Sequence, residues 1–326
     1  MNDPHSPEIS VVIVTPDHYN TIRKTIRHLR TQTVRDKLEV VIVAPSADRL
    51  GLDLSEMKDF LRFLVVEVGE IKLVAKAKAI AVRQAIAPIV AFAEDHCYPD
   101  PDWAEALIAA HQQGFAAVGP AMGNANPNTM VSWAGMFMGF GPYFEPARAR
   151  ETLGLPWHNI SYKRQVLMDY GDKLDSMIVV EGMLLDELRV KGYGIYLEAA
   201  AKTYHVNISL LSSWVRQAFW GGWLFAAVRA RQKRWPLWRR LLYIGGAPLI
   251  PLVRLRRTIR EIKRSGREQK LIPKIFPALI SGLVSHATGE LAGYAFGLGK
   301  ADEHYSYYEM ARIRHVVPED RDLLTL

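Results

Sequence analysis

Patterns typical of buried strands and of helices alternate along the first part of the chain. A continuous run of mostly β-branched apolar residues at 9–15 is typical of a strand buried on both faces, and residues 21–31 carry apolar side chains at helical spacing. A second apolar run at 38–43 completes a strand–helix–strand unit. The same pattern predicts a strand at 63–68, a helix at 74–87 and a strand at 89–93. The first ~120 residues are therefore expected to form a doubly wound α/β unit with a mostly parallel sheet.

The pattern changes after Pro120. Residues 123–141 are rich in Gly, Asn and Met, so we predict loop and short elements there. Further on, the pattern predicts an amphipathic helix at 180–191, a short strand at 195–197 and a long aromatic helix at 211–231. These elements are expected to complete the fold of the first half.

Composition narrows the class of protein. Apolar residues make up 49% and charged residues 23% of the chain, which excludes wholesale disorder. The single cysteine, Cys97, excludes an internal disulfide and favours a reducing compartment. The first ten residues lack the pattern of a signal peptide, and no uncharged apolar stretch of about 18 residues predicts a confident membrane span. We expect the protein in the cytosol.

The positive charge is concentrated in one segment. Residues 229–270 carry a net charge of +12, whereas the rest of the chain sums to −5. The basic residues flank apolar runs, a pattern that suits an anionic membrane surface better than a nucleic acid. A solvated basic helix packed on the core is the alternative.

Ligand-type residues follow a predicted buried strand. The strand at 89–93 runs directly into Glu94-Asp95-His96. Ligands in open α/β sheets bind at the carboxyl ends of strands, and two acids with an imidazole are suitable ligands for a divalent cation. The alternative is that Glu94 and Asp95 only cap a helix that begins near Asp102.

Several segments together resemble family 2 glycosyltransferases of the GT-A fold. They are the apolar runs at 9–15 and 38–43, the acidic triplet with the following Pro99-Asp100-Pro101-Asp102-Trp103, the Asn-containing segment 158–164, Val179-Val180-Glu181 ahead of a helix, and Tyr204-His205. The chain's segment 289–294 also resembles bacterial membrane-associated members.

The resemblance implies a domain organisation. A GT-A domain is expected over 1–230, with a nucleotide-sugar-binding half at 1–120 and an acceptor half at 121–230. A basic, amphipathic helical tail that associates with membranes is expected over 231–326.

The resemblance also implies roles for individual residues. The expected metal ligands are Asp95, His96 and His205, and the expected base is Glu181. The residues expected to bind the nucleotide-sugar are Thr15, Asp17, Lys78, Glu94 and Asp95. The residues considered for stacking on sugars, with buried core as the alternative, are Trp103, Trp133 and Trp157.

The chain departs from the family pattern at three places. His96 stands where a carboxylate is usual, so both Mn²⁺ and Mg²⁺ are left open. Ala44-Pro45-Ser46 replaces the acid that usually reads the nucleobase, and Glu181-Gly182 replaces an acid pair. The position of the base is therefore also open toward Asp186 or Glu187.

The implied function is metal-dependent, inverting transfer of a sugar from a nucleotide-sugar to a lipid-linked or polysaccharide acceptor in cell-envelope glycan synthesis. A catalytically inactive membrane assembly protein and a nucleotidyltransferase are the alternatives. Implied partners are the donor, the acceptor and anionic lipid, with no nucleic acid and with a homo-oligomer left open. The expected place is the cytoplasmic face of the bacterial inner membrane, peripheral or monotopic.

Two apolar segments of the tail, 241–253 and 275–298, are expected to lie in the membrane interface without spanning it. The aromatic residues expected at headgroup depth are Trp235, Trp238 and Tyr243. The basic cluster 254–257 is expected to contact anionic lipid.

Overall fold

The computed structural model describes residues 6–325, except the side chains of residues 268 and 269. The prediction that the chain has no signal peptide rests partly on residues 1–5, which lie outside the described residues. The chain forms two compact units: unit 1 contains residues up to 123, 145–205 and 324 onward, and unit 2 contains 124–144 and 206–323. The boundaries between the two units therefore do not fall at residue 230. The predicted boundary at 230 between a catalytic domain and a tail stays a prediction.

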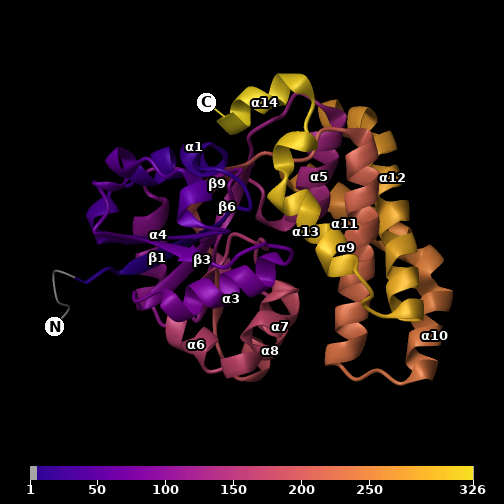
Figure 1. Ribbon diagram of the computed structural model, residues 1–326. Coiled ribbons are helices and arrows are strands. Elements are labelled where there is room, and N and C mark those ends of the chain that lie inside the picture. The colour runs from indigo at the N-terminus through magenta and orange to yellow at the C-terminus, as the bar shows by residue number, and fades with distance from the viewer. Residues whose placement is uncertain (1–5, 326) are drawn as a thin grey trace. The chain divides into compact units, whose positions relative to one another are not determined.

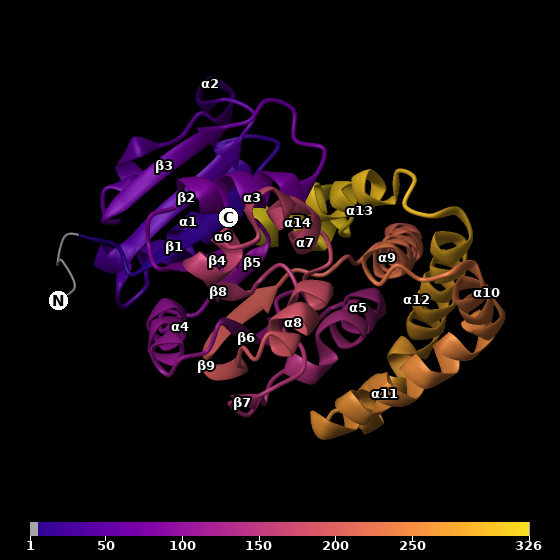
Figure 2. The ribbon, with the colours of Figure 1, turned by 90° about the horizontal axis from the view of Figure 1, so that it is seen from below.

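Unit 1 is built on a mixed sheet of nine strands among the described residues (Figures 1 and 2). The strands are β1 (Ile9–Val14), β2 (Leu38–Ala44), β3 (Arg62–Glu67), β4 (Ile89–Ala93), β5 (Cys97–Pro99), β6 (Ala117–Asn124), β7 (Arg150–Glu151), β8 (Ser161–Lys163) and β9 (Ile195–His205). Their order is β3-β2-β1-β4-β8-β6-β9-β5, with β7 paired to β9. The first four strands of this order are parallel, and β8 joins β4 antiparallel.

The parallel half forms where the sequence predicts it. Every residue of β2 and β4 is buried, as is all of β1 except its last residue, because helices cover both faces of the sheet. In β1, Val12 lies opposite Val41 of β2 and Phe92 of β4. The α/β fold class is therefore confirmed.

The helices of unit 1 cover the two faces of this sheet (Figure 1). They are α1 (Tyr19–Arg30), α2 (Ala47–Leu50), α3 (Val74–Gln84), α4 (Trp103–Gln112), α6 (Arg164–Met168), α7 (Leu174–Ile178) and α8 (Glu181–Val190). The apolar sides of α1 and α4 join alternate residues of β1 and β2 in one core, which includes Ile22 and Leu107. On the opposite face, α3 packs with α6 and α7.

Helix α3 ends three residues before the predicted end. Ala85 is already extended, with ψ of 144°. The backbone N–H of Ile86 donates to the buried carboxylate of Glu39 (2.8 Å), and that of Ala87 donates to the Ser10 hydroxyl (3.1 Å). These two backbone N–H groups do not continue the helical hydrogen bonds, because buried side chains of β1 and β2 accept from them.

Two strands are longer than predicted or are missing from the prediction. Strand β9 extends to His205, well beyond the predicted 195–197, and β6 has no predicted counterpart. A Cβ at Gly119 would lie 2.7 Å from the Pro156 ring, and one at Gly123 would lie 2.4 Å from the Tyr204 ring. Close packing therefore selects glycines in β6, and glycines weaken the strand signal in the sequence.

Unit 2 is helical, and one of its helices corrects the sequence prediction. Its helices are α5 (Met130–Phe140), α9 (Leu211–Gln232), α10 (Leu237–Gly246), α11 (Ile250–Arg264), α12 (Glu268–Phe296), α13 (Ala301–Met310) and most of α14 (Pro318–Thr325). Loop and short elements are predicted for 123–141, and this prediction is wrong for the second part, where the 11-residue helix α5 forms. The Thr129 hydroxyl caps α5 by accepting from Ser132 N–H (3.1 Å), and Phe137 is buried, so packing outweighs the low helix propensity of the glycines.

Helices α9 and α12 are in backbone contact. A Cβ at Gly222 would meet the carbonyl oxygen of His286 at 2.0 Å, and one at Gly289 would meet that of Phe219 at 1.9 Å. Glycine is therefore required at both positions for this approach. Within the described residues one helix, Lys270–Phe296 in α12, is long and apolar enough to cross a membrane by length and composition.

Candidate active site

The carboxyl ends of the parallel strands bring several predicted residues to one edge of the sheet. Thr15 follows β1 and is fully buried, and its hydroxyl accepts from the backbone N–H of Asp17 (3.3 Å). Glu94 follows the neighbouring strand β4. The predicted donor-binding residues Thr15, Asp17 and Glu94 therefore belong to the edge at which α/β sheets bind ligands.

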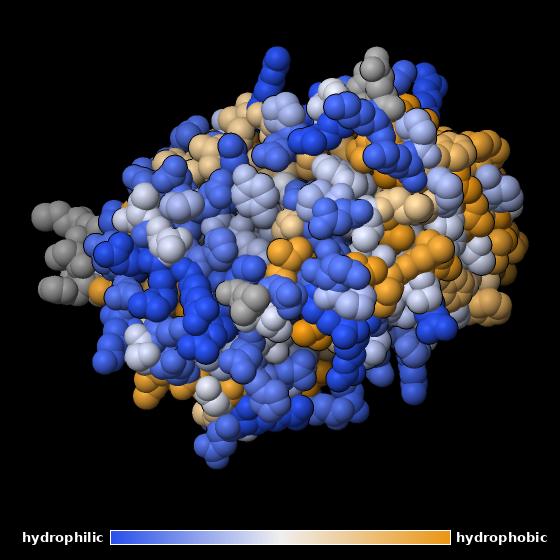
Figure 3. All heavy atoms as spheres, turned by 90° about the horizontal axis from the view of Figure 1, so that it is seen from above, coloured by the Kyte–Doolittle hydropathy of each residue, from blue (hydrophilic) through white to orange (hydrophobic). Residues whose placement is uncertain are grey.

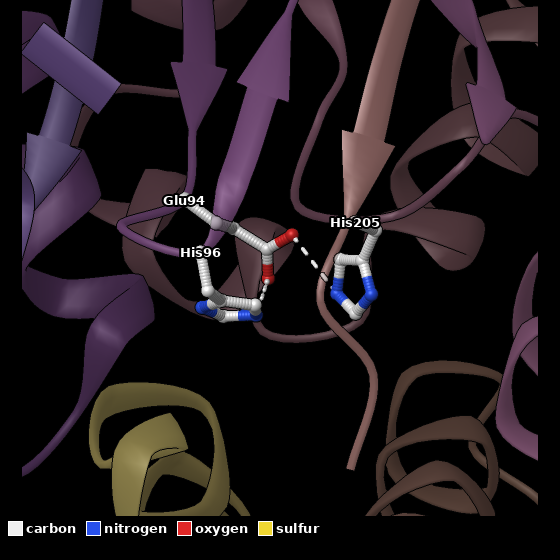
Figure 4. Close-up of side chains that lie close together, drawn as sticks. All are labelled: Glu94, His96 and His205. Carbon is white, nitrogen blue, oxygen red and sulfur yellow. Dashed lines mark ion pairs between the residues drawn. The ribbon is translucent and has the colours of Figure 1, made fainter. Parts of the chain in front are cut away.

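Glu94, His96 and His205 form a compact ligand set (Figure 4). One ligand atom from each residue lies within 4.8 Å of the others. The two carboxylate oxygens of Glu94 face the two imidazoles, at 3.6 Å from His96 Nε2 and 3.6 Å from His205 Nε2. Lone pairs at such spacing repel one another unless a proton or a metal ion lies among them, so the donor set fits a divalent cation.

The structure places Asp95 beside this set. Its Oδ1 lies 2.5 Å from His96 Nδ1, and both side chains are buried. An Nδ1–H that donates to Asp95 leaves the lone pair of the neutral ring on Nε2, the nitrogen that faces Glu94. The geometry therefore favours Glu94 over the predicted Asp95 as the carboxylate ligand, with Asp95 orienting His96.

Strand pairing explains how His205 reaches the triplet. Strand β5 pairs antiparallel with β9, and Cys97 lies directly opposite His205. The Cys97 thiol is buried and lies 3.1 Å from the hydroxyl of Thr203 on the paired strand. His205 therefore joins Glu94 and His96 through a pairing between segments about 100 residues apart.

Two further residues hold Glu94 in place. Asn159 Nδ2 donates to Glu94 Oε2 (2.6 Å), and the Thr25 hydroxyl donates to the Glu94 carbonyl (3.1 Å). The sequence indicates Asn159 only as part of the acceptor-side segment, and it gives no signal for Thr25. The Asn159 amide thus fixes one oxygen of the Glu94 carboxylate by a contact that the sequence alone does not indicate.

A second carboxylate, that of Glu181, lies next to an ammonium group and a backbone N–H, whereas Glu94 faces imidazoles. It begins α8 and is 1% exposed. Its Oε1 lies 3.5 Å from the Lys78 ammonium, and its Oε2 accepts a short hydrogen bond from the backbone N–H of His158. Lys78 is also buried, 3.4 Å from His158 Nδ1 and 4.5 Å from the centre of the Phe92 ring. The structure thus brings together Lys78 and Glu181, which the sequence predicts as diphosphate-binding residue and base.

The two other candidates for the base lie away from this cluster. The side chains of Asp186 and Glu187 are both 41% exposed and pair on their own helix with Arg189 and Lys191. Glu181 is therefore the best placed of the three acids.

The buried tyrosines near these clusters are not alternative bases. Burial, followed by the charge of Glu181, raises the pKa of Tyr162, and burial, followed by the charge of Asp95, raises the pKa of Tyr98. Both phenols therefore stay protonated at neutral pH.

The three candidate sugar-stacking tryptophans differ in burial. Trp103 belongs to the core between α4 and the sheet, so the stacking role considered for it is wrong. Trp133 is half-buried in unit 2, with its ring nitrogen donating to the Pro127 carbonyl. Trp157 is half-buried next to Gly182, where a Cβ would lie 2.8 Å from its indole ring. A side chain at residue 182 would therefore require the Trp157 ring to shift.

Comparison with known families gives a match over the part of the chain that ends before Glu181 and His205. A sequence model of the family described as "Glycosyl transferase family 2" matches residues 10–171, which include the strand ends, Lys78, the Glu94 triplet and Asn159. The fold and this match define a glycosyltransferase. More narrowly, residues 10–171, about half of the chain, belong to glycosyl transferase family 2, which confirms the family predicted from the sequence.

Individual proteins resemble the chain only distantly. No curated protein matches it. A structure described as "Crystal structure of GalNAc-T7 with UDP, GalNAc and Mn2+" has 13% identity and a TM-score of 0.46, over 63% of this chain and 44% of that chain. The "Crystal structure of S. aureus TarS" has 16% identity and a TM-score of 0.43, over 87% of this chain and 55% of that chain. The chain thus spans about half the length of these two proteins, and the family assignment rests on the sequence match.

Proposed function

We propose that the protein transfers a sugar, with inversion, from a nucleotide-sugar to an acceptor hydroxyl and requires a divalent cation. The observation that supports this most is the set of Glu94, His96 and His205 at the ligand-binding edge of a family 2 glycosyltransferase. These three residues would hold the cation, and Asp95 would fix the tautomer of His96. When bound, the cation would neutralise charge on the donor's diphosphate.

The transfer itself needs one proton acceptor. As the acceptor oxygen bonds to the anomeric carbon, the bond from that carbon to the diphosphate breaks, and the acceptor proton passes to a base. We assign this role to Glu181. Its present partners, Lys78 and the His158 N–H, would have to release at least one carboxylate oxygen.

Lys78 offers a way to do this. An ammonium that exchanges Glu181 for the donor's diphosphate would bind the donor and free the base in the same step. The exchange combines the two predicted roles of Lys78 and Glu181, and the 3.5 Å contact between them makes the two roles dependent on each other.

The inactive alternative has support from the same contact, because a carboxylate held by an ammonium and a backbone N–H could serve structure alone. The proposed acceptor is a lipid-linked or polysaccharide glycan of the cell envelope. The proposed place is the cytoplasmic face of the inner membrane of a bacterium.

Nucleoside diphosphate release tests the proposal. The protein is incubated with UDP-, GDP-, dTDP- and CDP-sugars, with Mn²⁺ or Mg²⁺ and native membranes. We expect one donor class to react and to raise the melting temperature only when the cation is present. Failure of every donor, with or without stabilisation by the cation, would favour the inactive alternative.

A further inference from the structure

Helices α10 and α11 of unit 2 expose a continuous apolar stripe. Six of its side chains are between 51% and 67% exposed: Trp238, Leu241, Leu242, Leu249, Leu252 and Val253. Leu241 and Leu242 lie three and four residues after Trp238, so these three share one side of α10. Leu252 and Val253 lie three and four residues after Leu249, which ends the 3₁₀ turn Ala247–Leu249, so these three share one side at the start of α11. On the face seen from above, which is not the face of α10, apolar side chains also gather over helices of unit 2 (Figure 3).

The opposite sides of the same helices are fixed to the rest of unit 2. Arg240 Nε donates to the Tyr294 carbonyl of α12 (2.8 Å), and Tyr243 packs on Trp235, with ring centres 4.5 Å apart. In α11, Thr258 and Ile262 are buried. The exposed stripe is therefore the outer face of packed helices.

This packing corrects part of the sequence-based expectation. Trp235 is 7% exposed and stacks on Tyr294, so it does not reach headgroups, whereas Trp238 is on the surface. Arg254 is half-buried, which leaves Arg256 and Arg257 as the exposed members of the basic cluster.

Basic residues flank the stripe at both ends. Arg231, Lys233 and Arg234 are exposed ahead of α10, and Arg256, Arg257, Arg260 and Lys263 are exposed beyond Val253. Residues 237–264 carry eight Lys or Arg and one acid, Glu261. Apolar side chains bordered by cations match a lipid leaflet with anionic headgroups.

We infer that this face docks in the plane of an anionic membrane, with the stripe inserted in one leaflet. Helices α10 and α11 have 10 and 15 residues, about 15 Å and about 22 Å, and neither can cross a hydrocarbon core of about 30 Å. The inference deepens the proposed function, because it brings the enzyme to a lipid-linked acceptor. The docking itself needs no sugar donor.

Vesicle co-sedimentation of the full chain tests the docking. We expect binding to vesicles containing phosphatidylglycerol, weaker binding to phosphatidylcholine, and release by high salt. Leu241→Glu with Leu242→Glu should weaken binding at least tenfold. The matched control places two glutamates at exposed apolar positions of unit 1, Leu153→Glu with Val190→Glu, and should bind like the wild type.

Quenching by brominated lipids identifies the inserted side. Trp238→Phe should remove part of the quenching of tryptophan fluorescence, whereas Trp235→Phe should leave it. The opposite result would place a different face in the lipid and overturn the inference.

Three other results would also overturn it. The first is that the Leu241→Glu, Leu242→Glu variant binds the vesicles as well as the wild type does. The second is that protease reaches the C-terminus from both sides of sealed vesicles. The third is that the wild type forms a dimer without lipid and that the same two substitutions dissociate it. The last result would make the stripe an interface between two copies. Donor-dependent diphosphate release is measured on the same variants in solution, so loss of docking is distinguishable from loss of the proposed activity.

Discussion

Two carboxylates of the candidate site in unit 1, Glu94 and Glu181, differ in one decisive way in their surroundings. Glu94 faces two imidazole nitrogens at 3.6 Å each, whereas Glu181 faces the Lys78 ammonium at 3.5 Å. The segment 158–159 contacts both, because His158 N–H donates to Glu181 and the Asn159 amide donates to Glu94.

The difference concerns the source of positive charge. The Lys78 ammonium lies next to Glu181, so this pair can persist without a ligand. The Glu94 carboxylate instead faces two imidazole nitrogens, and a set of oxygen and nitrogen ligand atoms is stabilised by a bound cation. Only the Glu94 cluster should therefore respond strongly to metal, while the Glu181 cluster should respond to donor and to substitution of its own lysine.

Loss of an imidazole should have the largest effect. His96→Ala or His205→Ala removes one of three ligand atoms, so sugar transfer should fall by about 10³-fold or more and stabilisation by Mn²⁺ should disappear. Asp95→Asn should cost only about 10–100-fold, the usual effect of an outer-sphere partner. Activity assays with thermal shifts measure both, and a larger loss in Asp95→Asn would restore Asp95 as the ligand.

Removal of the proposed base should come next. Glu181→Gln keeps the size of the side chain and removes its proton-accepting ability, so kcat should fall about 10²–10⁴-fold. Stabilisation by Mn²⁺ should stay unchanged. Asp186→Asn is the matched control, since Asp186 is exposed on the same helix, and inactivity of this control with an active Glu181→Gln would move the base to Asp186.

Loss of the lysine should appear in folding stability. Lys78→Met leaves Glu181 buried without its ammonium, so the free energy of unfolding should fall by about 3–5 kcal/mol in urea titrations. Adding Glu181→Gln should recover much of this loss, because the unpaired charge is then gone. Equal stability of the single and double variants would show that the pair does not interact as the geometry indicates.

The sequence predicts the parts of unit 1 whose signal is local. Strands β1, β2 and β4 are continuous apolar runs, and each forms within two residues of its predicted bounds. The sequence does not predict β6, because its glycines depend on distant contacts such as that of Gly123 with Tyr204, and it does not predict α5, because Gly135 and Gly139 lower the helix propensity of that segment. The intrinsic helix and strand propensities of the residues do not reflect such contacts.

The candidate site follows the same rule. A strand end next to Glu94 and His96 is visible in the sequence, whereas His205 reaches them through its pairing opposite Cys97 and was indicated only by family resemblance. Which carboxylate of the triplet turns toward the imidazoles depends on the turn after β4 and cannot be obtained from residue order. The pairing of Lys78 with Glu181 likewise depends on how α3 and α8 meet in the folded chain.

The smallest expected effect concerns Gly182, which follows Glu181 at the position where the family usually has a second acid. An added Cβ would lie 2.8 Å from the Trp157 indole, which is half-buried and must shift. Gly182→Ala should therefore lower the free energy of unfolding by up to about 1 kcal/mol, since overpacking is partly offset by the better helix propensity of alanine. Gly139→Ala in α5, where a Cβ meets no atom within 4 Å, is the control and should stabilise by about 0.5–1 kcal/mol. Equal stabilisation by both substitutions in urea titrations would mean that Trp157 does not select the glycine, and the missing second acid would then need a functional explanation.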